Sequence, residues 1–178
     1  MNEGLIPRRY AKAIFRYARS LHADKEVYEK MNLFLEIFQA HPALQKALLN
    51  PVLSMEDKEL LLSTSVGIEP VQVYMRGIRL LIRNHRERYI RTIALIYGEL
   101  YRKAHGIVQV NIVTARQLPE ELMERIRTAV RKKIAGEIEF TASVDPEIIG
   151  GFVLKAGSRQ LDASVRKELT LIRKGYGL

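Results

Sequence analysis

Cysteine is absent from this 178-residue chain. Its absence excludes disulfides, thiolate metal ligands and a cysteine nucleophile, and agrees with a reducing compartment. Long hydrophobic runs are also missing, because no apolar stretch reaches the roughly 18 residues that a membrane-spanning helix needs. The N-terminal residues are expected not to be a secretory signal, since no apolar core follows their charges.

Catalytic motifs are missing as well. The sequence has no Gly-Lys-Ser/Thr phosphate loop and no Gly-x-Ser-x-Gly elbow. Metal-ligand spacing is absent among the four scattered histidines, His22, His41, His85 and His105. Asp145 is interpreted as a turn former before proline and Asp162 as a helix N-cap, rather than as a carboxylate pair. We therefore expect no catalytic, cofactor or metal site.

Positive charge is plentiful: the net charge is +9, and most of the excess lies in residues 1–105. This balance fits nucleic acid, an anionic membrane surface or an acidic protein partner. One stretch carries six arginines, Arg76, Arg79, Arg83, Arg86, Arg88 and Arg91. Such a run is either a solvated helix face or a surface for acidic groups. A nucleic-acid-binding protein stays as the alternative, although the aromatic interleaving of single-strand sites is missing.

Helical periodicity fills residues 1–105 and predicts a six-helix bundle. Pro7 is expected at the first position of the first helix, and Asp24 is expected to cap the second. Ser54 and Asp57 resemble a capping box at the start of the fourth. The predicted helices are residues 7–21, 24–39, 43–49, the segment after Ser54 up to Gly67, 70–83 and 86–104.

Alternating apolar residues begin after His105-Gly106, where the helical pattern ends. Residues 108–112 and 138–144 alternate as half-buried strands. Pro119 opens a helix between them, with a predicted inner face of Leu122, Ile126, Val130 and Ile134. The fold class is thus predicted as α+β, with a small α/β domain at residues 106–178 that has a short mixed sheet and two helices.

The segment 145–169 predicts a strand, a tight turn, a second strand and a helix. Gly150-Gly151 indicates a bulge or a place where two backbones come close. Gly157-Ser158 is the expected turn, residues 159–161 the return strand, and Asp162 the start of a helix. That helix carries Val165, Leu169 and Ile172 on one face.

Three segments resemble the delta subunit of the F-type ATP synthase, the family of the mitochondrial oligomycin-sensitivity-conferring protein. They are RRYAKAIFRYA at Arg8–Ala18, HPALQKALLNPVLSMEDKELLL at His41–Leu62 and IIGGFVLKAGSRQLDASVRKEL at Ile148–Leu169. Their order and spacing agree with the family along nearly the whole chain. The resemblance implies a non-catalytic stator connector that ties the catalytic head to the peripheral stalk.

Partners also follow from this resemblance. The family holds the N-terminal helix of an alpha subunit between its first and fifth helices, here Pro7–Leu21 and Pro70–Arg83. This implies groove residues Tyr10, Ile14, Arg76, Arg79, Leu80 and Arg83. The b-subunit end of the stalk is expected on the C-terminal domain, at Phe152, Arg159, Leu161 and Leu169. We expect a monomer when isolated, bound peripherally through the complex to the cytoplasmic face of a bacterial inner membrane.

Overall fold

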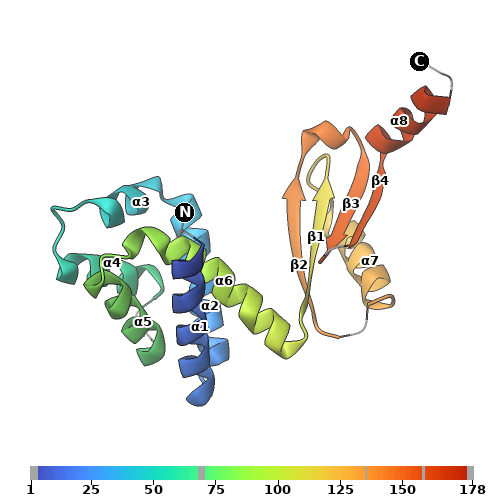
Figure 1. The fold of residues 1–178 in the computed structure, drawn as a ribbon. Helices are drawn as coiled ribbons and strands as arrows, with labels where there is room; N and C mark the ends of the chain where they lie inside the picture. The colour runs from blue at the N-terminus through green and yellow to red at the C-terminus, as the bar shows by residue number, and fades with distance from the viewer. Residues whose placement is uncertain (1–3, 68–70, 135, 158, 176–178) are drawn as a thin grey trace. The chain divides into compact units, whose positions relative to one another are not determined.

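The computed structural model describes residues 4–67, 71–134, 136–157 and 159–175 (Figure 1). These residues form eight α-helices and one four-stranded mixed sheet, which confirms the predicted α+β class. The chain divides into two compact units, residues 1–104 and 105–178. The predicted helix start at Glu69-Pro70 and Ser158 of the predicted turn lie outside the described residues.

All regular elements described in the first unit are helices. They follow the predicted pattern, with shifted ends. They are α1 (Leu5–Ser20), α2 (Asp24–Ala40), α3 (Pro42–Leu49), α4 (Met55–Ser65), α5 (Gln72–Arg83), the 3₁₀ turn η1 (Glu87–Tyr89) and α6 (Ile90–His105). α1 starts two residues before Pro7, which a first turn tolerates because its N–H groups need no helical partner. Asp24 is the first residue of α2 and Ala23 holds the N-cap position, so the predicted cap position was wrong.

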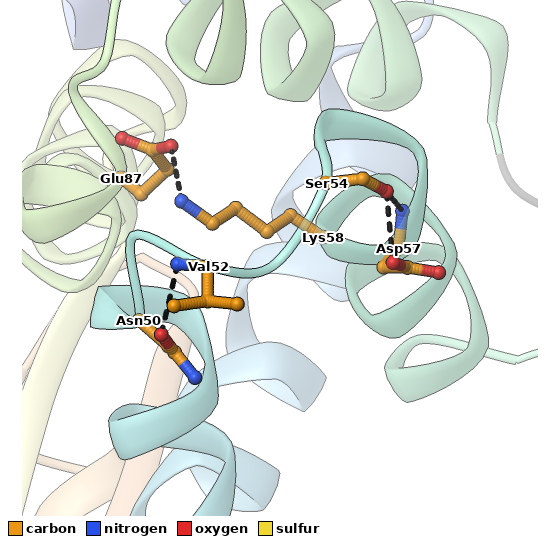
Figure 2. A network of polar contacts seen from close by, with 6 residues as sticks. All are labelled: Asn50, Val52, Ser54, Asp57, Lys58 and Glu87. Carbon is orange, nitrogen blue, oxygen red and sulfur yellow. Dashed lines mark hydrogen bonds and ion pairs between the residues drawn. The ribbon is translucent and has the colours of Figure 1, made fainter.

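Polar contacts fix the start of α4, as Figure 2 shows. The Ser54 hydroxyl oxygen accepts a hydrogen bond from the Asp57 backbone N–H at 3.1 Å and donates to the Asp57 carboxylate at 2.8 Å. This confirms the side-chain cap, although the carboxylate bonds the hydroxyl rather than the Ser54 backbone. One turn further on, Lys58 pairs with Glu87 of η1 at 3.0 Å, and both side chains are only 10% exposed. The pair joins α4 to the start of α6.

The core of this unit contains aromatic contacts between side chains from three helices. Tyr97 meets Phe15 edge-on at 5.6 Å, and Tyr28 stacks on Tyr101 at 4.2 Å. The Tyr97 hydroxyl donates to the Asp24 carbonyl at 3.0 Å. These contacts hold α1 and α2 against α6, which lies far from them in the sequence. Tertiary packing rather than helix propensity therefore stabilises the helices of this unit.

The second unit has a four-stranded sheet in the order β2-β1-β3-β4. β1 and β2 are parallel, while β3 pairs antiparallel with β1 and with β4. Its described elements are β1 (Val108–Thr114), α7 (Glu120–Arg131), β2 (Ile138–Val144), the 3₁₀ turn η2 (Pro146–Ile148), β3 (Gly151–Ala156), β4 (Arg159–Ser164) and α8 (Val165–Gly175).

One face of this sheet packs on α7. Val110 and Ile112 of β1 meet Met123 and Val130 of α7 in the core. The predicted inner-face residue Leu122 is 40% exposed, and Met123 is buried in its place, because α7 is rotated from the predicted face. The opposite sheet face carries polar residues together with a second, smaller apolar cluster, in which Val113 and Val153 pack with Ile148.

The glycine pair lies where β3 begins, and the predicted close approach of two backbones is confirmed. Gly151 has a φ of +75°, and a Cβ added there would lie 2.1 Å from the Ala163 carbonyl oxygen of β4. Gly150 lies against Val165, whose Cγ2 would be 3.1 Å from such a Cβ. The missing side chains therefore let β4 and the start of α8 close on β3.

β4 extends to Ser164, three residues beyond its predicted end, so Asp162 lies in the strand and does not open the helix. Its carboxylate accepts the Ser164 backbone N–H at 3.0 Å. Hydrogen bonds from the Ser164 side chain and backbone lower the pKa of Asp162 below its ordinary value. The Ser164 hydroxyl oxygen accepts from the Lys167 N–H at 3.2 Å, so Ser164 is the side-chain cap of α8.

Candidate partner-binding surfaces

The first candidate surface is a groove between α1 and α5, which pack against each other in opposite directions. Residue numbers fall along α1 as they rise along α5. The facing pairs are Tyr17 with Arg76, Ile14 with Gly77, and Tyr10 with Leu80. Both helices have exposed outer faces, so the groove between them is open to a partner.

Ile14 forms the floor of this groove. It is only 4% exposed, and a Cβ added to Gly77 would lie 3.0 Å from its Cδ1 atom. The absent side chain at Gly77 therefore lets the two helices approach closely. The predicted groove residue Ile14 thus lies beneath the groove, in the core, and supports the side chains above it.

A hollow of about 330 Å³ lies toward the start of α1 and the end of α5. Its lining consists of Ile6, Arg9, Tyr10, Ala13, Leu80 and Arg86. The structure thus brings together two of the predicted residues, Tyr10 and Leu80. An apolar hollow with arginines among its lining residues suits the apolar stripe of an amphipathic helix.

The three predicted arginines lie on other parts of α5. Arg76 donates a hydrogen bond to the Tyr17 hydroxyl and lies 5.9 Å from that ring. Arg79 pairs with Glu59 of α4 at 2.5 Å. Arg79 and Arg83 line a separate hollow between α4 and α5. Arg76, Arg79 and Arg83 of α5 therefore lie across two neighbouring surfaces rather than along one.

Four lining residues of the α1–α5 hollow were not predicted. Ile6 and Ala13 lie one helical turn on either side of Tyr10, so the helical repeat could have found them. Arg9 lies next to Tyr10 on the same helix. Arg86 follows the end of α5 and reaches the hollow only because α5 runs antiparallel to α1, which no local sequence signal gives.

Every charged residue of α1 and α5 is a cation. These residues are Arg8, Arg9, Lys12, Arg16, Arg19, Arg76, Arg79 and Arg83. Among the described residues, Arg79 alone of this set pairs with a carboxylate. A surface of one charge sign around an apolar groove attracts an acidic partner and repels a basic one.

The second candidate surface is an apolar hollow of about 500 Å³ in the C-terminal unit. It is lined by Ala115, Arg116, Leu118, Leu122, Ile126, Pro146, Ile149, Gly150, Gly151 and Phe152. Phe152 is the one residue of the predicted stalk contact in this lining. Leu122, the residue wrongly predicted for the core, also lies here, so its exposure belongs to this surface.

Ile149 of this hollow has an unusual backbone. Its φ is +69°, a region where a β-branched residue is strained, and its side chain is 64% exposed. Neither feature favours folding, because the strain costs free energy and the exposed side chain buries little surface. Sequence analysis placed Ile149 beside the glycine pair but gave no signal for this conformation.

The other predicted stalk residues lie on β4 and α8. Leu161 is paired with Leu154 of β3 and is 58% exposed, and Arg159 lies at the start of the same strand. Leu169 belongs to an exposed stripe of α8 whose members Val165, Leu169 and Ile172 are 36%, 51% and 54% exposed. The Val165 N–H donates to the Gly150 carbonyl at 3.0 Å, so the stripe begins beside the hollow.

Neither surface carries a catalytic arrangement. Among the described residues, no group of three or more histidine, aspartate or glutamate side chains is placed to hold a metal ion. No helix within the described ranges is both long and apolar enough to cross a membrane. Both surfaces instead combine apolar hollows with exposed helix faces, which is the chemistry of protein–protein contact.

Comparison with known proteins agrees with this reading. The family described as the ATP synthase delta (OSCP) subunit matches residues 6–175. "ATP synthase subunit delta" of Parabacteroides distasonis is 38% identical over 98% of this chain and 97% of its own length. That of Desulfovibrio desulfuricans is 33% identical over 99% and 98%. A chain in a Toxoplasma gondii mitochondrial ATP synthase structure shares the fold, with a TM-score of 0.73 at 18% identity and 97% coverage of both chains.

The family match spans nearly the whole chain, and the relatives are matched over nearly their full length. This favours the non-catalytic stator connector over the nucleic-acid-binding alternative. The chain belongs to the ATP synthase delta (OSCP) subunit family.

Proposed function

We propose that this delta subunit holds the N-terminal helix of an ATP synthase alpha subunit in the groove between α1 and α5. The supporting observation is the apolar hollow at Tyr10 and Leu80, set on two helices whose charged residues are all cations. A helix that lays an apolar stripe into such a groove gains affinity from its anchors. The arginines add register and faster association. In this proposal residues 1–105 act as a six-helix bundle domain.

The C-terminal domain, residues 106–178, holds the end of the b subunit in this proposal. The 500 Å³ hollow and the exposed stripe of α8 supply an apolar surface that begins at Ile149 and Phe152 and continues to Leu169. Surfaces of this kind are rare on a chain without partners because they favour aggregation. Arg159 and Leu161 add the edge of β4 to the contact.

The mechanical role follows from the two contacts. The rotor exerts torque on the catalytic head during proton-driven ATP synthesis, and the head turns with it unless it is held. One chain that binds both the head and the stalk makes the second contact effectively intramolecular, which raises its occupancy. The isolated subunit acts as a monomer and attaches peripherally, through the complex, to the cytoplasmic face of a bacterial inner membrane.

Binding of the alpha-subunit N-terminal peptide from the same genome tests the groove. Calorimetry with the full chain is expected to show binding that Leu80→Ser weakens by at least about fivefold, since an apolar anchor is lost. Leu95→Ser is the matched control, because Leu95 on α6 is 42% exposed and Leu80 is 45% exposed. Equal affinity in all three proteins would overturn the groove assignment.

A peptide from the C-terminal end of the b subunit tests the second contact. Leu169→Ser is expected to weaken its binding to the full chain, whereas Leu171→Ser is not. The two leucines are 51% and 59% exposed on α8 but point about 160° apart, given roughly 100° of rotation per residue. A loss caused by Leu171→Ser alone would assign the contact to the other face of α8.

A further inference from the structure

Two arginines line the α1–α5 hollow. Arg9 comes from α1, and Arg86 follows the end of α5. Among the described residues, no carboxylate lies within ion-pair distance of either guanidinium. Arg86 is also a partly buried residue that lines an apolar hollow. A guanidinium group without an acidic partner forms a strong charge-assisted hydrogen bond when a partner protein supplies a carboxylate.

Neighbouring arginines have contacts within the chain. Arg79 pairs with Glu59, and Arg76 donates to the Tyr17 hydroxyl. Arg88 lies 4.6 Å over the Tyr89 ring and donates to its hydroxyl at 2.5 Å. The two arginines that line the hollow without a described carboxylate partner therefore lie at one end of the groove, where α1 begins and α5 ends.

We infer that the helix held in this groove carries acidic side chains at that end, on both edges of its apolar stripe, which pair with Arg9 and Arg86. This inference rests on the proposed function of the groove and adds the chemistry and register of its occupant. The stripe contacts Tyr10 and Leu80, and the two arginines bind carboxylates from either side of it. Guanidinium groups bind carboxylates in a bidentate geometry. The two pairs therefore determine the position of the bound helix along the groove as well as the sign of its charge.

The positive charge of Arg9 and Arg86 contributes more to discrimination between acidic and other helices than to the affinity for the bound helix. Amphipathic helices with the same apolar stripe are common, and an apolar hollow alone distinguishes them poorly. A basic or neutral helix leaves Arg9 and Arg86 unpaired against the apolar lining, which costs binding free energy. An acidic helix also associates faster, and the gain decreases as salt is added.

The experiment uses the full chain and the alpha-subunit N-terminal peptide of the same genome, in two forms. One form keeps its acidic residues, and in the other each is replaced by the matching amide. Fluorescence anisotropy at low and high salt is expected to show about five- to tenfold weaker binding of the amide form at low salt, and a smaller difference at high salt. Arg9→Glu and Arg86→Glu are each expected to weaken the acidic form by a similar factor.

Arg8→Glu is the matched control. Arg8 and Arg9 are adjacent, exposed and equally charged, but Arg8 points about 100° away from Arg9 around α1 and is not in the hollow. Arg8→Glu is expected to leave the affinity within about twofold, since only screened long-range repulsion changes. Arg9→Gln gives a milder second variant, and circular dichroism checks that each variant is folded.

Two outcomes separate this inference from the proposed function. If both peptide forms bind equally and Arg9→Glu has the effect of Arg8→Glu, the groove holds its helix without acidic contacts and the inference is wrong. If neither form binds the unaltered chain at any salt concentration, the groove assignment itself is wrong. Restored binding of Arg9→Glu to a peptide with one acidic residue changed to lysine identifies the paired residue.

Discussion

The two candidate partner surfaces present apolar side chains on different kinds of backbone. The α1–α5 groove lies on two regular helices fixed by a buried core in which Ile14 meets Gly77. The C-terminal surface lies at a turn, where Ile149 has a positive φ and Gly151 touches the backbone of β4. Packing therefore preforms the first surface, for which we propose selection by charge, whereas the shape of the second depends on the conformation of a few residues.

The helices at the two surfaces also differ in support. α1 has five buried residues along its length, while Val165, Leu169 and Ile172 of α8 remain exposed. α8 has 11 residues, and isolated helices of this length are marginal in water. We therefore expect a bound partner to order the C-terminal surface more than the groove, and the two surfaces to respond differently to the same kind of change.

The largest effect is expected from Gly151→Ala. The new Cβ would lie 2.1 Å from the Ala163 carbonyl oxygen, and both are held by the β3–β4 pairing. Because backbone must move and φ is positive, the C-terminal unit should lose about 3–5 kcal/mol. Thermal and urea denaturation measure the loss. Gly157→Ala has a positive φ but no atom within 4 Å of the new Cβ, and should cost about 1 kcal/mol.

Gly151→Ala also tests whether the surfaces are independent. The alpha-subunit peptide is expected to bind this variant with unchanged affinity, whereas the b-subunit peptide loses its site. Loss of both activities together would show that the helical unit depends on the folded C-terminal unit. That result would contradict the view of two separately built surfaces.

A second contrast lies between a buried and an exposed ion pair. Lys58 and Glu87 are each 10% exposed in their side chains, while Arg166 and Glu147 of the C-terminal unit are 60% and 78% exposed. Lys58→Met leaves the Glu87 carboxylate buried without its partner and should cost about 3 kcal/mol. Arg166→Met should cost less than about 1 kcal/mol, because water replaces the lost contact.

The double variant Lys58→Met/Glu87→Leu sharpens this measurement. Removing both charges also removes their desolvation, so the double variant is expected to recover most of the stability lost in Lys58→Met. Urea denaturation of the unaltered chain, of Lys58→Met, of Glu87→Leu and of the double variant gives the coupling energy. Equal losses in single and double variants would show that Lys58 acts through packing rather than through its charge.

Much of the fold could be predicted from sequence, because local signals carry it. The apolar repeat gave the helices, Ser54 gave the start of α4, and Gly106 at φ +68° ended α6 as predicted. The predictions were wrong where tertiary contacts determine the ends of an element. Asp162 had the right residue type for a cap, yet pairing with Val153 kept it in β4 and moved the cap to Ser164.

The candidate surfaces were less accessible to prediction for the same reason. Tyr10 and Leu80 lie together because two helices far apart in sequence pack antiparallel, and the family resemblance supplied that pairing. Arg86 was noticed only as part of an arginine run. Nothing in the residues around Ile149 indicates its positive φ, since β-branched residues rarely adopt it.

Ile149→Gly is expected to separate stability from binding at the C-terminal surface. Glycine adopts a φ of +69° without strain, and the exposed isoleucine buries little surface, so the variant should be as stable or about 1 kcal/mol more stable. Affinity for the b-subunit peptide should fall, because an apolar contact is lost. Reduced stability with unchanged affinity would show that Ile149 serves folding, and would remove it from the partner surface.

The smallest effect concerns two tyrosines of the helical core. Tyr97 and Tyr74 are both fully buried, but the Tyr97 hydroxyl donates to the Asp24 carbonyl, while that of Tyr74 has no partner among the described residues. Tyr97→Phe should cost about 1 kcal/mol, and Tyr74→Phe should be neutral or slightly stabilising, because it removes an unpaired buried hydroxyl. Urea denaturation at neutral pH compares them.

Alkaline pH extends this last comparison. Burial raises the pKa of both hydroxyls above the ordinary value of 10. Above pH 10 the unfolded chain releases these protons while the folded chain keeps them, so stability decreases as pH rises. Each phenylalanine variant should reduce that slope, because it removes one such group. An unchanged slope in both would mean that water reaches the hydroxyls, and the aromatic core would then be as open to solvent as the turn at Ile149.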